Sequence, residues 1–139
     1  MTALGLVVAQ FYEELAAEME AEARETVEQQ DAHVADTVHV PGVYDTPLAA
    51  DRLARQDRID AVAVLGVVVT GDTDHDQVVT HAAARRLSDV GLRRDTPVTF
   101  GVAGPDMSAA EAHERIEKCA SAAEAAIDLT DALPARGQQ

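Results

Sequence analysis

Lysine is almost absent from this sequence. Its 139 residues include 25 acidic and eleven basic residues, for a formal net charge of -14, and Lys118 is the only lysine. Nucleic acid and anionic membrane surfaces are poor partners for such a chain, because they carry the same sign of charge. An acidic excess with so little lysine is typical of proteins from organisms that keep molar salt in the cytoplasm, where a Debye length of about 3 Å screens self-repulsion.

Cysteine and long apolar runs are also scarce. The one cysteine, Cys119, cannot form an internal disulfide, which fits a reducing cytoplasm, and we expect it to be a small buried helix residue. There is no basic start followed by an apolar segment, and no apolar run of transmembrane length, so the sequence predicts a soluble, unexported protein. We expect one domain over residues 1–139, with a frayed tail at residues 134–139.

Strand-like and helix-like segments alternate along the chain. We expect strands at residues 4–9, 33–40, 61–69 and 97–102, and helices at 13–30, 46–55, 75–92 and from Ser108 to about 133. Residues 62–69 are almost all Val, Ala and Leu, the pattern of a strand covered on both faces. This order predicts an α/β fold with a four-stranded parallel sheet between two helical layers, as in flavodoxin-like proteins.

A buried strand, a glycine turn and a histidine follow one another at residues 66–75. Gly71 suits a sharp turn, and Asp72 or Thr73 suits the cap of the helix that follows. Ligands of open α/β sheets bind beyond the carboxyl ends of the strands, and backbone N–H groups at a helix start attract anions. We therefore expect a ligand site at this turn, with phosphate as the first candidate.

His75 is the candidate for proton transfer at this turn. It lies four residues before Val79, so its ring should lean toward the cleft, and an imidazole titrates near neutral pH. By position alone, an exposed or capping histidine is the alternative. Asp72, Asp74 and Asp76 next to His75 suggest a metal cluster, but neighbours in a turn rarely converge on one ion. We expect no metal, and we interpret Asp74 and Asp76 as helix-start acids.

Four segments of the chain resemble the lumazine synthase family of riboflavin biosynthesis. In sequence order they read LGLVVAQF, VPGVYDTPLAA, GVVVTGDTDHDQVV and PVTFGVAGPDMS, within residues 4–129, and the third is similar to the family's glycine, threonine and histidine signature. The resemblance implies condensation of 5-amino-6-(D-ribitylamino)uracil with 3,4-dihydroxy-2-butanone 4-phosphate. The implied products are 6,7-dimethyl-8-ribityllumazine, phosphate and water, and no cofactor takes part.

The resemblance also implies a role for each site residue. His75 would transfer protons, and the phosphate would be held by Gly71, Asp72, Thr73 and Arg115. The ring and ribityl chain would be held by Phe11, Val43, Tyr44, Asp45, Val67, Val69 and Phe100. In this family, sites lie between subunits of a pentamer, which can build a sixty-subunit shell, and Phe100 would serve the neighbour's site. The residues alone also allow an alternative for two of these roles. Arg115 is then a surface ion-pair residue, and Phe11 is an ordinary core side chain.

The chain departs from the family pattern in two places. Tyr12 stands where Asn is usual, and residues 120–122 (Ala-Ser-Ala) stand where many bacterial members have a Gly, Asn and Lys segment, with Lys118 nearby but out of register. The shorter form resembles the archaeal branch, in agreement with the acidic surface. Two alternatives stay open: an archaeal-type riboflavin synthase, which takes two lumazines and no phosphate, and a non-catalytic flavin or lumazine binder.

Overall fold

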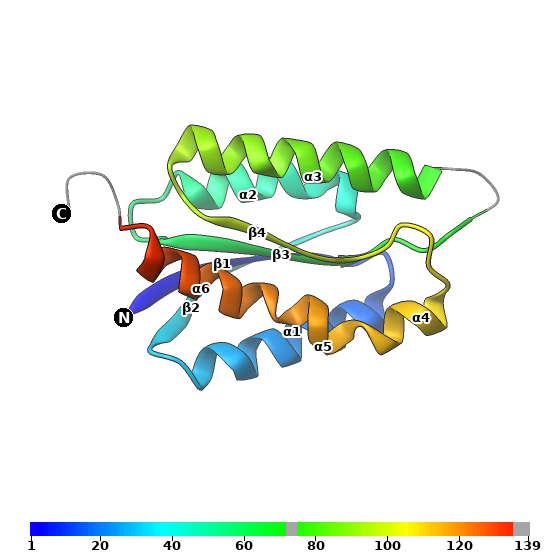
Figure 1. The fold of residues 1–139 in the computed structure, drawn as a ribbon, viewed down its shortest axis with the longest axis horizontal. Coiled ribbons are helices and arrows are strands. Elements are labelled where there is room, and N and C mark those ends of the chain that lie inside the picture. The colour runs from blue at the N-terminus through cyan, green and yellow to red at the C-terminus, as the bar shows by residue number, and fades with distance from the viewer. Residues whose placement is uncertain (72–74, 135–139) are drawn as a thin grey trace.

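One parallel sheet forms the centre of the molecule (Figure 1). The computed structural model describes residues 1–71 and 75–134. Its strands are β1 (Thr2–Ala9), β2 (Ala32–Val40), β3 (Ala61–Val67) and β4 (Val98–Ala103), in the order β2-β1-β3-β4. All three strand pairs are parallel. The predicted four-stranded flavodoxin-like sheet is therefore confirmed.

Helices cover both faces of this sheet (Figure 1). One layer holds α1 (Glu13–Glu28), α4 (Ala109–Glu114), α5 (Ile116–Ala120) and α6 (Ala122–Ala132); the other holds α2 (Thr46–Ala54), preceded by the short 3-10 helix η1 (Val43–Asp45), and α3 (His75–Arg94). Successive side chains of a strand point to opposite faces, so each layer has its own core. Leu4, Leu6 and Leu65 lie in the first core, and Val7, Val62 and Val64 lie in the second.

The C-terminal helical region is divided in a way that the sequence pattern did not predict. Ser108 caps its start, since Ser108 Oγ accepts a hydrogen bond from Glu111 N at 3.1 Å. Breaks at Arg115 and Ser121 then separate three helices. The region lies directly on β4: a Cβ on Gly101 would be 2.2 Å from the carbonyl oxygen of Cys119. This close contact fixes the side chains of α5 above the strand.

Three further predictions from the sequence can be compared with the structure. The strand expected at residues 61–69 ends earlier, at Val67. Cys119 is buried, as predicted. Of the predicted frayed tail only Pro134 is described, and it is exposed, while residues 135–139 lie outside the described residues. None of the helices in the described part of the chain is both long and apolar enough to cross a membrane.

Candidate functional site

A cavity of about 320 Å³ lies at the carboxyl ends of β1 and β3, and we call it the histidine cavity. Seven of the predicted site residues line it: Phe11, Val43, Tyr44, Val67, Val69, Gly71 and His75. They come from four separate parts of the chain, which meet because parallel strands end at the same edge of the sheet. The structure thus brings the candidate ring-binding residues and the candidate proton-transfer residue to one place.

Two aromatic side chains are open to solvent at this cavity. Phe11 is 73% exposed and Tyr44 is 67% exposed, so Phe11 is not an ordinary core side chain. The Phe11 ring lies edge-on to the ring of Tyr12, with 5.0 Å between the centroids and 75° between the planes. Tyr12 is half-buried against the first core and supports Phe11. Exposed aromatic faces of this kind suit the stacking of a planar ring.

Asp45 does not line the histidine cavity. Its Oδ2 accepts a hydrogen bond from Gly42 N at 3.0 Å, which closes the turn before α2. Asp45 instead lines, with Tyr44, a groove of about 540 Å³ between α2 and α3. The carboxylate therefore has a clear local task in shaping the turn, and its predicted contact to the substrate stays a prediction.

The segment predicted to bind phosphate is only partly described. Gly71 lines the histidine cavity, and His75 is exposed at the start of α3. Asp72 and Thr73, predicted to hold the phosphate, and Asp74 lie outside the described residues. Within residues 1–71 and 75–134, no three His, Cys, Asp or Glu side chains converge in a way that would hold a metal ion.

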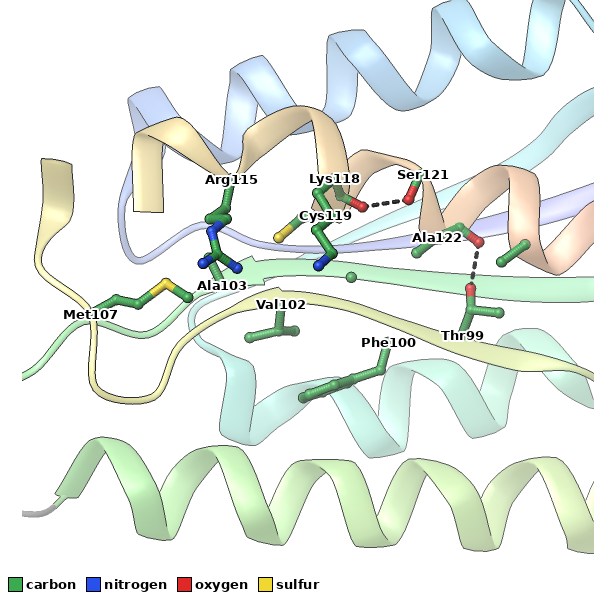
Figure 2. Close-up of a pocket in the computed structure, with 12 residues that line it drawn as sticks. Thr99, Phe100, Val102, Ala103, Met107, Arg115, Lys118, Cys119, Ser121 and Ala122 are labelled. Atoms are coloured by element: carbon green, nitrogen blue, oxygen red, sulfur yellow. Dashed lines mark hydrogen bonds between the residues drawn. The ribbon is translucent and has the colours of Figure 1, made fainter. Parts of the chain in front are cut away.

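A second cavity, of about 380 Å³, lies between β4 and helices α5 and α6, and we call it the arginine cavity. Figure 2 shows the side chains of Arg115 and Lys118 reaching into it from the helices, with Phe100 on the strand side. Among the described residues that line it there is no Asp or Glu, although the chain has 25 of them. The described lining therefore carries two positive side chains and no negative one.

Neither cation in the arginine cavity is used in an ion pair within the described residues, whose ion pairs all involve other side chains. Arg115 thus differs from the surface ion-pair residue that its position alone suggests. Burial raises the pKa of the Cys119 thiol, against the opposing effect of Arg115 and Lys118. The thiol stays neutral, and the two cations remain available to an anion such as phosphate.

Within one chain the predicted site residues are divided between the two cavities. Phe11, Gly71 and His75 line the histidine cavity, whereas Phe100 and Arg115 line the arginine cavity. A single subunit therefore does not bring Arg115 to the turn at Gly71, where the same phosphate was expected.

Asp76 is a residue whose surroundings the sequence did not predict. We interpreted it as a helix-start acid, and it does lie in the first turn of α3, but its side chain is also buried, at 5% exposure. It lines the histidine cavity, and its Oδ2 accepts a hydrogen bond from Asp106 N at 3.0 Å. Nothing in the local sequence distinguishes it from Asp74, because its partner is 30 residues away.

Comparison with known proteins gives matches that all carry the same name. Residues 2–133 match the model of the family described as 6,7-dimethyl-8-ribityllumazine synthase. The chain is 64% identical over 133 residues to the 6,7-dimethyl-8-ribityllumazine synthase of Halobacterium salinarum, covering 96% of this chain and 100% of that protein. It is 62% identical to the protein of the same name from Halorubrum lacusprofundi, covering 96% of this chain and 99% of that protein.

A more distant relative has the same name. The 6,7-dimethyl-8-ribityllumazine synthase of Methanocaldococcus jannaschii is 42% identical over 135 residues, covering 97% of this chain and 96% of that protein. These relatives do not favour a riboflavin synthase or a non-catalytic binder. The resemblance seen in four sequence segments is confirmed over nearly the whole chain, which belongs to the 6,7-dimethyl-8-ribityllumazine synthase family.

Proposed function

We propose that this protein condenses 5-amino-6-(D-ribitylamino)uracil with 3,4-dihydroxy-2-butanone 4-phosphate to 6,7-dimethyl-8-ribityllumazine, with release of phosphate and water. Besides family membership, the observation that carries the proposal is the histidine cavity, where exposed aromatic rings and His75 lie together. Phe11 and Tyr44 would hold the pyrimidine ring, with Val43, Val67 and Val69 forming the apolar wall. Asp45 would contact the ribityl chain after a change in its present hydrogen bond to Gly42.

His75 would move the protons of the reaction. The amine of the uracil attacks the carbonyl carbon of the second substrate, and water leaves as the imine forms. Elimination then breaks the C–O bond to phosphate. The ribitylamino nitrogen attacks the remaining carbonyl carbon to close the ring, and a second water leaves as the lumazine forms. Each step takes a proton from one atom and delivers one to another, which an imidazole does well near neutral pH. Fixing the two substrates beside each other should supply much of the rate.

Arg115 would hold the phosphate, together with Gly71, Asp72 and Thr73. Lys118 adds a second cation in the same carboxylate-free cavity. A phosphate monoester carries close to two negative charges at neutral pH, and it leaves as an anion. Two cations near the oxygen of the breaking bond would stabilise the charge that develops there.

The division of these residues between two cavities supports a site that two subunits share. We place the arginine cavity of one subunit, with Phe100 and Arg115, against the histidine cavity of the next, in a ring of five. Leu48, Val78 and Leu92 are more than half exposed on α2 and α3, and such side chains suit subunit contacts. A closed shell built from such pentamers and a cytoplasmic location stay predictions.

One assay tests the function. The purified protein in molar KCl is mixed with both substrates, and lumazine absorbance and free phosphate are followed together. We expect both to rise at the same rate. A second sample contains the protein and added lumazine. Tight binding of the added lumazine, with no phosphate release in the first sample, would instead indicate a binder, and consumption of the added lumazine would indicate a riboflavin synthase.

A further inference from the structure

Asp76 is a buried carboxylate that the proposed chemistry does not use. It directly follows His75 in the first turn of α3, and it is 5% exposed. The ion pairs of the described residues do not include it. Carboxylates are rarely buried without a specific polar contact, because the loss of water costs free energy.

The contact of Asp76 is with the loop that follows β4. Asp76 Oδ2 accepts a hydrogen bond from Asp106 N at 3.0 Å. Next to it, Gln77 Nε2 donates to Asp106 Oδ1 at 3.1 Å, on the exposed side. The first turn of α3 is thus joined to residues 104–107 at two points, and the buried one is made by Asp76. In Figure 1 this loop runs from the end of β4 to α4.

The same loop is bonded to the wall of the histidine cavity. Val68 N donates to the carbonyl oxygen of Ala103 at 2.8 Å, and Thr70 N donates to that of Met107 at 2.7 Å. Between them Gly104 has φ +115°, and a Cβ there would lie 2.0 Å from the carbonyl oxygen of Val68. Residues 104–107 therefore connect the cavity wall to the start of α3 across space.

We propose that Asp76 is a positioning residue for His75: its hydrogen bond to Asp106 fixes the start of α3, and with it the imidazole, against the wall of the histidine cavity. This inference rests on the proposed function and deepens it. A displacement of about 1 Å can lower a rate by about 10²-fold when reacting groups must be aligned. Loss of the bond should therefore act on turnover more than on substrate binding.

Kinetics of three variants test this. Asp76→Ala removes the acceptor, Asp76→Asn keeps one carbonyl oxygen, and Gln77→Ala removes only the exposed contact to Asp106. We expect Asp76→Ala to lower kcat about tenfold while KM for both substrates changes less than about twofold, which marks a loss in the transition state. Asp76→Asn should keep most of the activity, and Gln77→Ala should match wild type. An unchanged kcat in Asp76→Ala would overturn the proposal.

A double variant separates positioning from general loss of structure. If Asp76 acts through His75, the variant His75→Ala/Asp76→Ala should turn over no more slowly than His75→Ala alone, because coupled residues are not additive. If the fold-losses in kcat of the two single variants instead multiply in the double variant, Asp76 does not act through His75 and the positioning role is refuted. If Asp76→Ala does not fold, Asp76→Ser takes its place, since Ser is tolerated at a helix start but is too short to reach Asp106.

Hydrogen exchange gives a readout that needs no activity. The amide of Asp106 should exchange faster in Asp76→Ala than in wild type and in Gln77→Ala. Equal exchange in all three would show that the bond is not formed, and the inference would fail. The proposed function can fail separately. If wild type makes no lumazine, but the Asp106 amide still exchanges faster in Asp76→Ala than in wild type, the proposed function is wrong and the Asp76 contact is established.

Discussion

At the scale of single residues, His75 is the side chain whose removal should change chemistry most directly. We expect His75→Ala to lower kcat by about 10²-fold or less, the low end of general acid–base effects, because the substrates remain oriented by other residues. Steady-state rates at saturating substrates measure this. His81→Ala is a matched control, since His81 is exposed further along the same helix. An unchanged rate in His75→Ala would remove it from the mechanism.

At the scale of elements, one carboxylate joins the two helices that cover the second face of the sheet. Asp51 on α2 accepts hydrogen bonds from Arg94 Nε on α3 at 2.8 Å and from Arg55 Nη2 on α2 at 2.9 Å. The hydrogen bonds from Arg94 lower the pKa of Asp51 to about 2, although burial acts in the opposite direction. The contact between α2 and α3 therefore depends on the ionised form.

Substitution of Asp51 should weaken this contact. We expect Asp51→Asn to lower the free energy of unfolding by about 1.5–3 kcal/mol at neutral pH, since hydrogen bonds to charged groups stabilise by about this amount. Denaturant unfolding in molar KCl measures it. Asp57→Asn, an exposed position just after α2, is the matched control and should have no effect.

The difference in unfolding free energy between wild type and Asp51→Asn should also depend on pH. Because the folded-state pKa of Asp51 lies below its ordinary value of 3.8, the stability that Asp51 contributes is complete above pH 3.8 and is lost as pH falls toward about 2. The difference in stability between wild type and Asp51→Asn should therefore be constant near neutral pH and shrink below 3.8. A difference that grows on acidification would contradict this assignment.

At the scale of the whole molecule, the proposed shared site predicts complementation between two impaired variants. His75→Ala and Arg115→Gln each damage a different cavity, so a site made from the intact cavities of two neighbours should work. After dissociation and reassembly of an equal mixture, about a quarter of the sites in random rings should have both residues intact. Activity of the mixture above the mean of the separate variants supports the shared site. No gain after verified mixing would place the site within one chain.

Salt should stabilise this molecule and its assembly. With a net charge of -14, repulsion between like charges acts within the chain and, in the proposed assembly, between subunits. It extends over about 10 Å at 0.1 M salt and about 3 Å at 1 M. We therefore expect a lower melting temperature and smaller particles at 0.1 M than in molar KCl, by calorimetry and light scattering. Equal values at both salt concentrations would show that packing alone fixes the assembly.

A charge-reduced variant is the control for that experiment. Glu14, Glu22 and Glu25 are exposed on α1, and their replacement by Gln removes three negative charges without touching the core. If repulsion is the cause, the triple variant should lose less stability than wild type when salt is lowered. A salt dependence equal to that of wild type would point to another effect of KCl.

Local sequence patterns were enough to predict the sheet and the helices that cover it. Residues 61–67 are apolar throughout because both faces of β3 are covered, and Met19, Ala23 and Val27 recur on one face of α1. These are local periodicities, which follow from how side chains project from a strand or a helix. The glycine and histidine of the turn at residues 71–75 were recognisable for the same reason, because they are neighbours in the chain.

Folding in three dimensions determined which distant residues meet. It buried Asp76 against a loop amide 30 residues away, divided Arg115 and His75 between two cavities, and gave Lys118 a carboxylate-free pocket beside Arg115. It also broke the last helical region at Arg115 and Ser121, and it brought Cys119 and Ala122 into close contact with Gly101 on β4. Such outcomes depend on contacts across the fold, and local sequence carries no record of its long-range partners.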